Sequence, residues 1–226
     1  MKFHFLTIFP DMIESYLGEA MLKRAAEKKF VAFDVKNIRD YTLDKHKKVD
    51  ERPYGGGPGM IMTAEPILRA HAKLKMKGKK TKVVMLSPSG KMFNNIMAAK
   101  WAKQYSDIVF ICGRYEGVDD RVRKILKADE ISIGDFVLTG GELPALVMTD
   151  AICRQIPGVL GDHASVEESR NASPRVFTRP EILEFPKATK ATKTKPAQKG
   201  MLHKVPSVLV SGDHKKIEEW RKSQQK

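Results

Sequence analysis

The chain has 226 residues, of which 42% are hydrophobic. It is long enough to form one substantial core and a smaller second domain without stabilisation by disulfides or metal ions. Its 41 Lys and Arg against 27 Asp and Glu give a formal net charge of +14, which favours a polyanionic partner such as nucleic acid. No apolar run approaches the length of a membrane span, and the first ten residues show no basic leader. We therefore expect a cytoplasmic protein with no membrane partner.

The first sixty residues predict two strands, a helix and a loop. Alternation over residues 3–7 predicts a strand, and Pro10 with Asp11 predicts the stop and the cap before a helix. Residues 30–35 predict a second strand. Residues 49–59 include four glycines and two prolines, which no helix or central strand could hold, so we expect an exposed loop there.

From residue 82 onward, a strand, a glycine-containing loop and a helix follow one another three times. The predicted strands span residues 82–86, 108–112 and 130–133. The loops that follow them span residues 87–90, 113–117 and 134–141. Such repeats predict an α/β fold with a parallel sheet, in which the three loops converge at one edge. Glycines ordinarily only make turns, but three such loops together favour a ligand site at that edge.

The pattern changes after the third helix. We expect a first domain over residues 1–161, a flexible linker over residues 162–174 and a small second domain over residues 175–226, which ends in an amphipathic helix. Residues 187–200 are rich in Lys, Thr and Ala without apolar anchors, and predict a mobile basic excursion within the second domain.

Several familiar sites are disfavoured. No Lys-Ser/Thr follows the glycines at 55–59, which excludes a P-loop, and no G-x-G-x-x-G follows a strand. The six histidines show no metal-binding spacing, so no metal site is predicted. Cys112 and Cys153 lie in apolar stretches and are typical of core residues in a reducing compartment. By itself, Arg154 at the end of the third helix is best explained as complementing the helix dipole.

Seven segments carry a resemblance to a known family. They span residues 53–60, 83–90, 112–117, 132–144, 156–161, 177–181 and 208–214. In order and in composition they resemble the bacterial tRNA (guanine-N1)-methyltransferase family, TrmD, almost from end to end. The resemblance implies a SPOUT-class enzyme: a parallel sheet flanked by helices with a deep trefoil knot, plus a small helical C-terminal domain that binds RNA.

The resemblance also implies S-adenosylmethionine as the cofactor, bound in a bent shape by backbone groups of the three loops. The expected cofactor-binding residues are Leu86, Ser87, Pro88, Gly113, Tyr115, Glu116, Ile133, Gly134, Asp135, Phe136, Val137, Leu138, Gly140, Gly141 and Pro144. The implied acceptor is N1 of guanosine 37 in tRNA, with the anticodon branch lying across a homodimer that shares its active sites. The expected RNA-binding residues are Asp50, Tyr54, Pro58, Gly59, Arg114 and His214.

The chemistry requires a general base, because N1 of guanine is protonated at neutral pH, and a donor near O6. Arg154 matches the family's catalytic arginine in position, and arginine suits this role because it keeps its charge. The family's base is an Asp in a Glu-Glu-Asp-Ser-Phe segment, where an ungapped alignment places Ser169. Serine is a poor base, and a one-residue shift places Glu168 there instead. We therefore predict Glu168 as the base, with Glu167 in reserve.

Two other functions stay open at this point. Ser169 at the base position is compatible with a noncatalytic RNA-binding homologue, although such a protein need not retain intact cofactor loops. A SPOUT enzyme could also act on another RNA position, such as a ribosomal or 2'-O-ribose site, but the loop at 53–60 and the C-terminal domain disfavour this. The sequence leaves open whether Mg2+ assists proton removal, and whether the basic excursion contacts phosphates.

Overall fold

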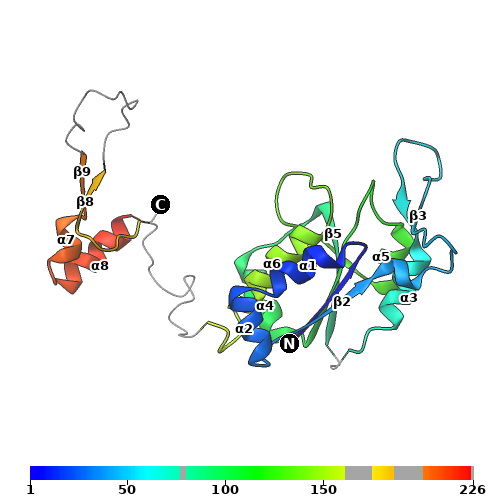
Figure 1. Cartoon of the computed structure of the whole chain (residues 1–226), viewed down its shortest axis with the longest axis horizontal. Helices are drawn as coiled ribbons and strands as arrows, with labels where there is room; N and C mark the ends of the chain where they lie inside the picture. The colour runs from blue at the N-terminus through cyan, green and yellow to red at the C-terminus, as the bar shows by residue number, and fades with distance from the viewer. Residues whose placement is uncertain (77–79, 161–174, 186–200, 225–226) are drawn as a thin grey trace, which may run out of the picture. The chain divides into compact units, whose positions relative to one another are not determined.

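The computed structural model describes residues 1–76, 80–160, 175–185 and 201–224. The chain divides into two compact units, Met1–Val166 and Glu167–Lys226 (Figure 1). The predicted linker at 162–174, with Glu167, Glu168 and Ser169, and the predicted basic excursion at 187–200 lie outside the described residues.

The first unit is built on a five-stranded sheet in which all the neighbouring strands are parallel. Its strands in spatial order are β2 (Ala32–Asn37), β1 (Lys2–Thr7), β6 (Asp107–Ile111), β5 (Thr81–Met92) and β7 (Asp129–Ser132). The predicted parallel α/β sheet is therefore confirmed. Because the strands are parallel, the loops after β5, β6 and β7 leave the same edge of the sheet.

Helices cover both faces of this sheet (Figure 1). One face carries α1 (Pro10–Leu17), α2 (Ala20–Glu27), α4 (Asn95–Gln104) and α6 (Glu142–Arg154). The other carries η1 (Ile38–Tyr41), α3 (Ala64–Ala72) and α5 (Asp120–Leu126). Each face has its own apolar core, so the sheet is buried on both sides.

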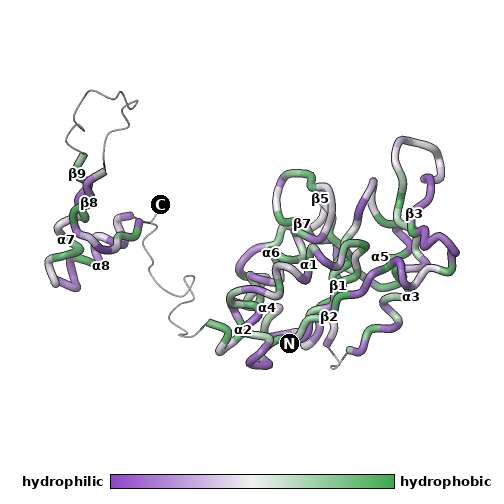
Figure 2. Tube along the Cα trace, in the orientation of Figure 1, coloured by the Kyte–Doolittle hydropathy of each residue, from purple (hydrophilic) through white to green (hydrophobic). Residues whose placement is uncertain are grey.

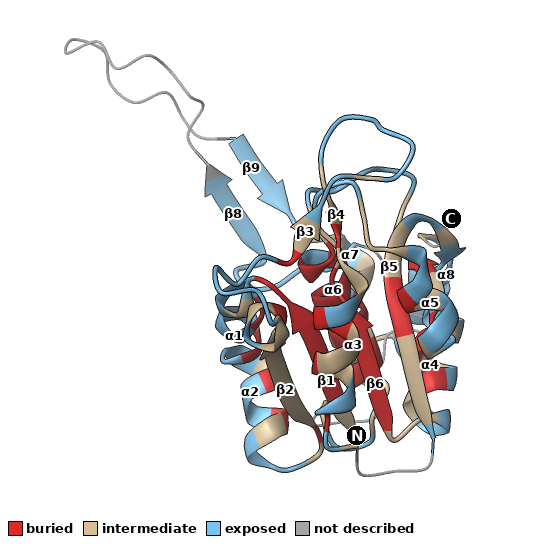
Figure 3. Ribbon diagram, turned by 90° about the vertical axis from the view of Figure 1, so that its right-hand side faces the viewer, coloured by how far each residue is buried: buried red, intermediate tan, exposed pale blue. Residues whose placement is uncertain are grey.

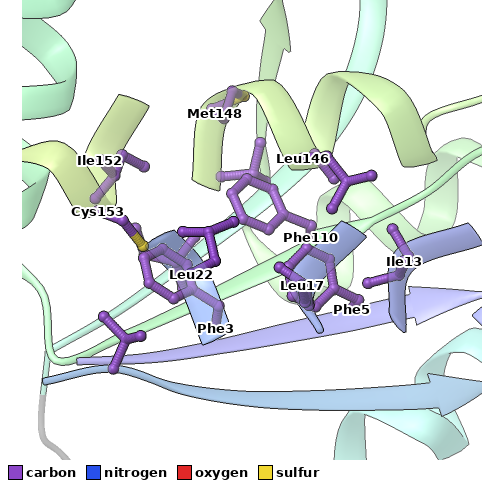
Figure 4. Packing of buried hydrophobic residues seen from close by; sticks show 14 of the residues in the cluster. Phe3, Phe5, Ile13, Leu17, Leu22, Phe110, Leu146, Met148, Ile152 and Cys153 are labelled. Carbon is purple, nitrogen blue, oxygen red and sulfur yellow. The ribbon is translucent and has the colours of Figure 1, made fainter. Parts of the chain in front are cut away.

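The central strands show why the sheet is stable. In β1, Phe3 and Phe5 point into one core and Leu6 into the other, and all three are fully buried. Figure 4 shows Phe3, Phe5 and Phe110 packed beneath side chains of α1, α2 and α6, and Figure 3 shows the central strands as buried. The predicted strand is confirmed, but the alternation reflects two buried faces rather than one buried and one solvated face.

The start of the first helix differs from the prediction. Asp11 does not cap it: Phe9 occupies the N-cap position without a side-chain hydrogen bond, and Pro10 is the first helical residue. Proline is well suited to that position because its missing N–H would have no helical partner there. Helix α2 was not predicted at all.

The segment predicted as a turn at 87–90 lies instead within β5. Leu86 and Lys91 both pair with Ile131 of β7, so the four residues between them form an irregularity in the register. At Gly90, an added Cβ would lie 2.5 Å from the backbone nitrogen of Ile131. Only glycine therefore permits this close approach of β5 to β7.

The glycine-rich segment is an exposed loop, as predicted. It lies between two short antiparallel strands, β3 (Asp50–Glu51) and β4 (Ile61–Met62). Gly55, Gly56 and Gly57 all have positive φ, which explains the choice of glycine in this tight connection.

The second unit contains more than helices. Strands β8 (Ile182–Phe185) and β9 (Met201–Lys204) form an antiparallel pair, which the sequence analysis did not predict. Two helices follow, α7 (Ser207–Val210) and α8 (His214–Ser223). The predicted terminal helix is confirmed, and the Asp213 side chain caps it by accepting from the backbone N–H of Lys216 at 3.2 Å.

Candidate functional site

Residues 86–88 of β5 and the loops that follow β6 and β7 come together around one cavity. Every residue predicted to bind the cofactor lines this cavity except Asp135, which is exposed. The structure adds lining residues that were not predicted for the cofactor: Arg114, Gly117, Ile131, Ser132 and Thr139. The sequence pattern therefore identified the cavity, although each loop lies far from the others along the chain.

Close backbone approach holds the second and third loops together. The N–H of Gly141 donates to the carbonyl of Gly113 at 2.9 Å. A Cβ at Gly141 would lie 2.8 Å from Cα of Cys112, so no side chain fits there without displacing backbone. The glycine is required by this approach and not only by a turn.

An ion pair reinforces the same contact. Nε of Arg114 donates to Oε2 of Glu142 at 2.9 Å, and the Thr7 hydroxyl donates to Oε1 of Glu142 at 2.6 Å. Glu142 is completely buried in the first turn of α6, where a carboxylate also complements the helix dipole. Nη1 of Arg114 donates to the carbonyl of Thr139 at 3.3 Å, and its guanidinium lies 4.6 Å from the Phe9 ring centroid.

Sequence reasoning placed Arg114 in the RNA-binding set and missed Glu142 and Thr7. In the structure, Arg114 is only 15% exposed and connects the second loop to the third. One signal was available: Glu142 is a charged residue at the start of a largely apolar helix, directly after two glycines. Thr7 is 135 residues away from Glu142, and no local pattern relates the two.

The loop at 53–60 adjoins the second cofactor loop. The N–H of Glu116 donates to the carbonyl of Met60 at 3.0 Å, and the N–H of Met62 donates to the carbonyl of Gly117 at 2.9 Å. Gly59, one of the predicted RNA-binding residues, lies directly against the Glu116 side chain. The structure therefore brings the predicted RNA-binding loop beside the cavity.

The other predicted RNA-binding residues lie in different surroundings. Tyr54 is fully exposed, Pro58 is also exposed, and Asp50 lies half-buried in β3. His214 begins α8 in the second unit and is exposed.

Arg154 is at the opposite end of α6 from the cavity. Pro144 lines the cavity near the start of the helix, and ten residues of helix place Arg154 about 15 Å further along its axis. Arg154 is half-buried and does not line the cavity. Within one chain, the structure does not bring the predicted catalytic arginine to the predicted cofactor site.

A partly exposed apolar surface runs along α1 and α6. On α6, the apolar side chains of Leu143 and Val147 are 54% and 44% exposed. Spacings of four, three and four residues place Leu143, Val147, Asp150 and Arg154 on one stripe of α6. On α1, Tyr16 is 48% exposed and its hydroxyl donates to Asp150 at 2.7 Å, which fixes the two helices side by side.

The loop before α6 extends the apolar character of this region. Phe136 and Val137 are 53% and 81% exposed, and Leu138 is 37% exposed. Figure 2 shows this stretch as a hydrophobic segment. Phe136, Val137 and Leu138 also line the cavity, so this loop contributes exposed apolar side chains to it.

The two cysteines are free and completely buried, as expected of core residues. Burial raises the pKa of Cys153 to about 12, and burial followed by the Glu142 charge raises the pKa of Cys112. Neither thiol is therefore suited to act as a nucleophile near neutral pH.

In residues 1–76, 80–160, 175–185 and 201–224, no three His, Cys, Asp or Glu side chains cluster closely enough to hold a metal ion. In the same ranges, no helix has both the length and the apolar character needed to cross a membrane.

Comparison with known proteins agrees with the site. A family model described as tRNA (Guanine-1)-methyltransferase TrmD matches residues 1–226. The chain belongs to this family. A tRNA (guanine-N(1)-)-methyltransferase of Clostridioides difficile (strain 630) is 44% identical over 99% of this chain and 92% of its own length. A protein of the same name from Bacillus cereus (strain AH820) is 47% identical over 98% of this chain and 85% of its own.

A third relative supports the same assignment. The tRNA (guanine-N(1)-)-methyltransferase of Carboxydothermus hydrogenoformans is 43% identical over 99% of this chain and 82% of its own length. The predicted family is therefore confirmed, and with it the class of enzyme: TrmD proteins are methyltransferases that modify tRNA.

Proposed function

We propose that this enzyme transfers the methyl group of S-adenosylmethionine to N1 of guanosine 37 in tRNA, beside the anticodon. The observation that carries the proposal is the cavity formed by β5 and the loops after β6 and β7 in a chain of the TrmD family. The cavity supports the proposed cofactor and the adjoining loop at 53–60 supports the proposed RNA acceptor.

The cavity residues fit S-adenosylmethionine in their chemistry. The glycines at 113, 140 and 141 leave backbone groups accessible, and Leu86, Ile133 and Pro144 provide apolar surface. The carboxylate of Glu116 lines the same cavity and would attract the positive charges of the cofactor. The contact between Gly141 and Cys112 is compatible with the proposed trefoil knot, in which these loops would hold the cofactor in a bent shape.

When bound, the cofactor would supply a methyl group from its sulfonium, whose sulfur leaves readily as a neutral thioether. This chain's residues must then make N1 nucleophilic. We assign removal of the N1 proton to the carboxylate of Glu168, with Glu167 in reserve, because a general base is required at neutral pH. We assign to Arg154 a hydrogen bond to O6, where negative charge develops as the proton leaves.

We propose a homodimer with shared active sites. Within one chain, about 15 Å of α6 separates the cavity-lining Pro144 from Arg154. Arg154 lies on the same stripe of α6 as the exposed Leu143 and Val147. Pairing two chains through this stripe would cover the apolar side chains and carry Arg154 of one chain towards the cavity of the other.

The remaining predicted residues complete the RNA-binding surface. We propose that Asp50, Tyr54, Pro58 and Gly59 contact the anticodon branch beside the cavity, and that the second unit contributes His214. We propose that Arg114 acts on this surface by holding the second loop in place through Glu142. An excess of positive charge over the chain suits a tRNA partner in the cytoplasm.

The proposal is tested by methyl transfer from labelled S-adenosylmethionine to two tRNA transcripts. One carries guanosine at positions 36 and 37, and the other carries adenosine at 37. We expect label on the guanosine transcript alone. Glu168→Gln should abolish transfer and Ser169→Ala should retain it, which would also assign the base. If tRNA binds but neither transcript is labelled, the chain is a noncatalytic RNA-binding homologue and the proposal is wrong.

A further inference from the structure

A second hollow in the first unit lies beside the outer edge of the sheet, among α4, β5, α5 and β7. Its volume is about 480 Å3, and apart from Ile131 it shares no lining residue with the cofactor cavity. Strand β7 forms this edge of the sheet. Its lining combines basic residues, aromatic residues and two carboxylates: Lys82, Lys91, Lys100, Arg123, Trp101, Tyr105, Asp129 and Glu130.

Two of the four cations are held in place by partners. Lys82 forms an ion pair with Asp129, and its ammonium lies 5.7 Å and 5.8 Å from the ring centroids of Trp101 and Tyr105. Arg123 pairs with Asp120 at 2.7 Å and with Glu130 at 3.7 Å. The carboxylates of the hollow are therefore largely neutralised by these two cations.

The other two cations, Lys91 and Lys100, are free to bind a ligand. Lys91 and Lys100 are exposed, and within the described residues neither makes a hydrogen bond or an ion pair through its side chain. They enter the hollow from different elements, β5 and α4, which places two unneutralised positive charges over a floor formed by the nearly buried Trp101. Such an arrangement suits a phosphate group, since lysines act as point charges towards phosphate.

We propose that this hollow is an additional RNA-binding site, in which Lys91 and Lys100 contact backbone phosphates of the tRNA substrate outside the methyl-transfer cavity. RNA is the occupant that the observations favour, because the family modifies tRNA and the chain carries a net charge of +14. The site contributes affinity without reading sequence, because phosphate contacts position an RNA and do not identify its bases.

The test compares a double variant, Lys91→Ala with Lys100→Ala, with a charge-matched control. Lys23→Ala with Lys28→Ala serves as the control, because both lysines are exposed on or next to α2, beside the opposite edge strand β2 (Figure 3). Binding of labelled tRNA is measured by fluorescence anisotropy over a range of salt concentrations. Thermal unfolding of each variant verifies that the fold is intact.

We expect the double variant to lose about 5- to 10-fold in tRNA affinity at low salt, and its plot of log affinity against log salt to become shallower by about 2, one for each phosphate contact. The control should change the slope by less than about 0.5. In methyl-transfer assays, KM for tRNA should rise by a similar factor while kcat at saturating tRNA and the affinity for S-adenosylmethionine stay unchanged.

Two results would overturn the proposal. If the double variant binds tRNA with the same affinity and slope as the control, the hollow is not an RNA site. If tRNA binding is unchanged but calorimetry with inorganic pyrophosphate shows binding that the double variant has lost, the hollow takes a free phosphate compound instead. Both results are independent of the proposed acceptor and base, because neither depends on where the methyl group is placed.

Discussion

The Nε atom of Arg114 donates to the Oε2 atom of the buried Glu142 across 2.9 Å, and this ion pair joins the second cofactor loop to the first turn of α6. Glu142 also accepts from Thr7 at the end of β1. The cavity is therefore held in shape by a charge that lies entirely inside the protein.

This contact predicts the effect of Glu142→Gln. The substitution keeps the shape of the side chain but leaves the half-buried Arg114 without its counter-charge, so we expect a loss of about 2–4 kcal/mol in the free energy of unfolding. The affinity for S-adenosylmethionine should fall as well, because the second loop is released. Chemical denaturation and calorimetry measure the two effects. Unchanged stability and cofactor affinity would show that the ion pair does not organise the cavity.

The close approach at Gly141 predicts a steric effect. In Gly141→Ala, the new Cβ would lie 2.8 Å from Cα of Cys112, so backbone must move, at a cost of about 1–3 kcal/mol. Gly113→Ala is the matched control in the same cavity, because its Cβ would meet only the Val118 side chain at 3.3 Å, which can shift. We expect calorimetry to show a much larger loss of cofactor affinity for Gly141→Ala. Equal losses in the two variants would contradict this explanation.

The exposed stripe of α6 predicts the assembly. A charge at Val147 would have to be buried without a partner in the proposed dimer, so Val147→Glu should raise the dimer dissociation constant by about a hundredfold or more and abolish methyl transfer. Ile96→Glu on α4 is the control, since Ile96 is 80% exposed and lies outside the stripe. Sedimentation velocity measures the proportions of monomer and dimer for each variant. A Val147→Glu variant that stays dimeric would move the interface elsewhere.

Asp34 predicts part of the acid sensitivity. Burial alone would raise its pKa, but hydrogen bonds from Lys36 at 2.9 Å and Lys2 at 3.1 Å outweigh burial and lower the pKa from 3.8. A lowered carboxyl pKa stabilises the fold above pH 3.8, and this stabilisation is lost as the pH falls through the lowered value.

Asp34→Asn should therefore reduce stability at pH 7 by on the order of 1 kcal/mol and flatten the dependence of unfolding free energy on pH below about 4. Asp11→Asn is the control, because Asp11 is exposed and forms no ion pair within the described residues. Denaturation curves at pH 2.5 to 7 measure both variants. If Asp34→Asn keeps the acid dependence of the wild type, other carboxylates account for it.

The sequence predicted the sheet and the cavity because both follow from local patterns. Three strand, loop and helix repeats require a parallel sheet, and the parallel sheet brings the loops to one edge. The contact of Thr7 with Glu142 could not be predicted, because it joins residues 135 apart that no periodicity relates.

Helical spacing also has a limit that Val147 illustrates. An apolar stripe on a helix has the same spacing whether it is buried or exposed, so spacing alone could not predict that Val147 is 44% exposed. The prediction of a turn at 87–90 was wrong because it rested on composition alone. The composition of this segment is that of a turn, whereas pairing with β7 on both sides of it keeps it within β5.

The position of the methyl group on the RNA tests the proposed methyl acceptor directly. A tRNA transcript with guanosine at 36 and 37 is incubated with the enzyme and S-adenosylmethionine and then copied by reverse transcriptase. A methyl group on N1 blocks base pairing, so we predict a new stop immediately before guanosine 37, which is absent when Arg154→Ala replaces the wild type. Incorporated methyl groups without a stop at this position, as for a ribose methyl group or another nucleotide, would contradict it.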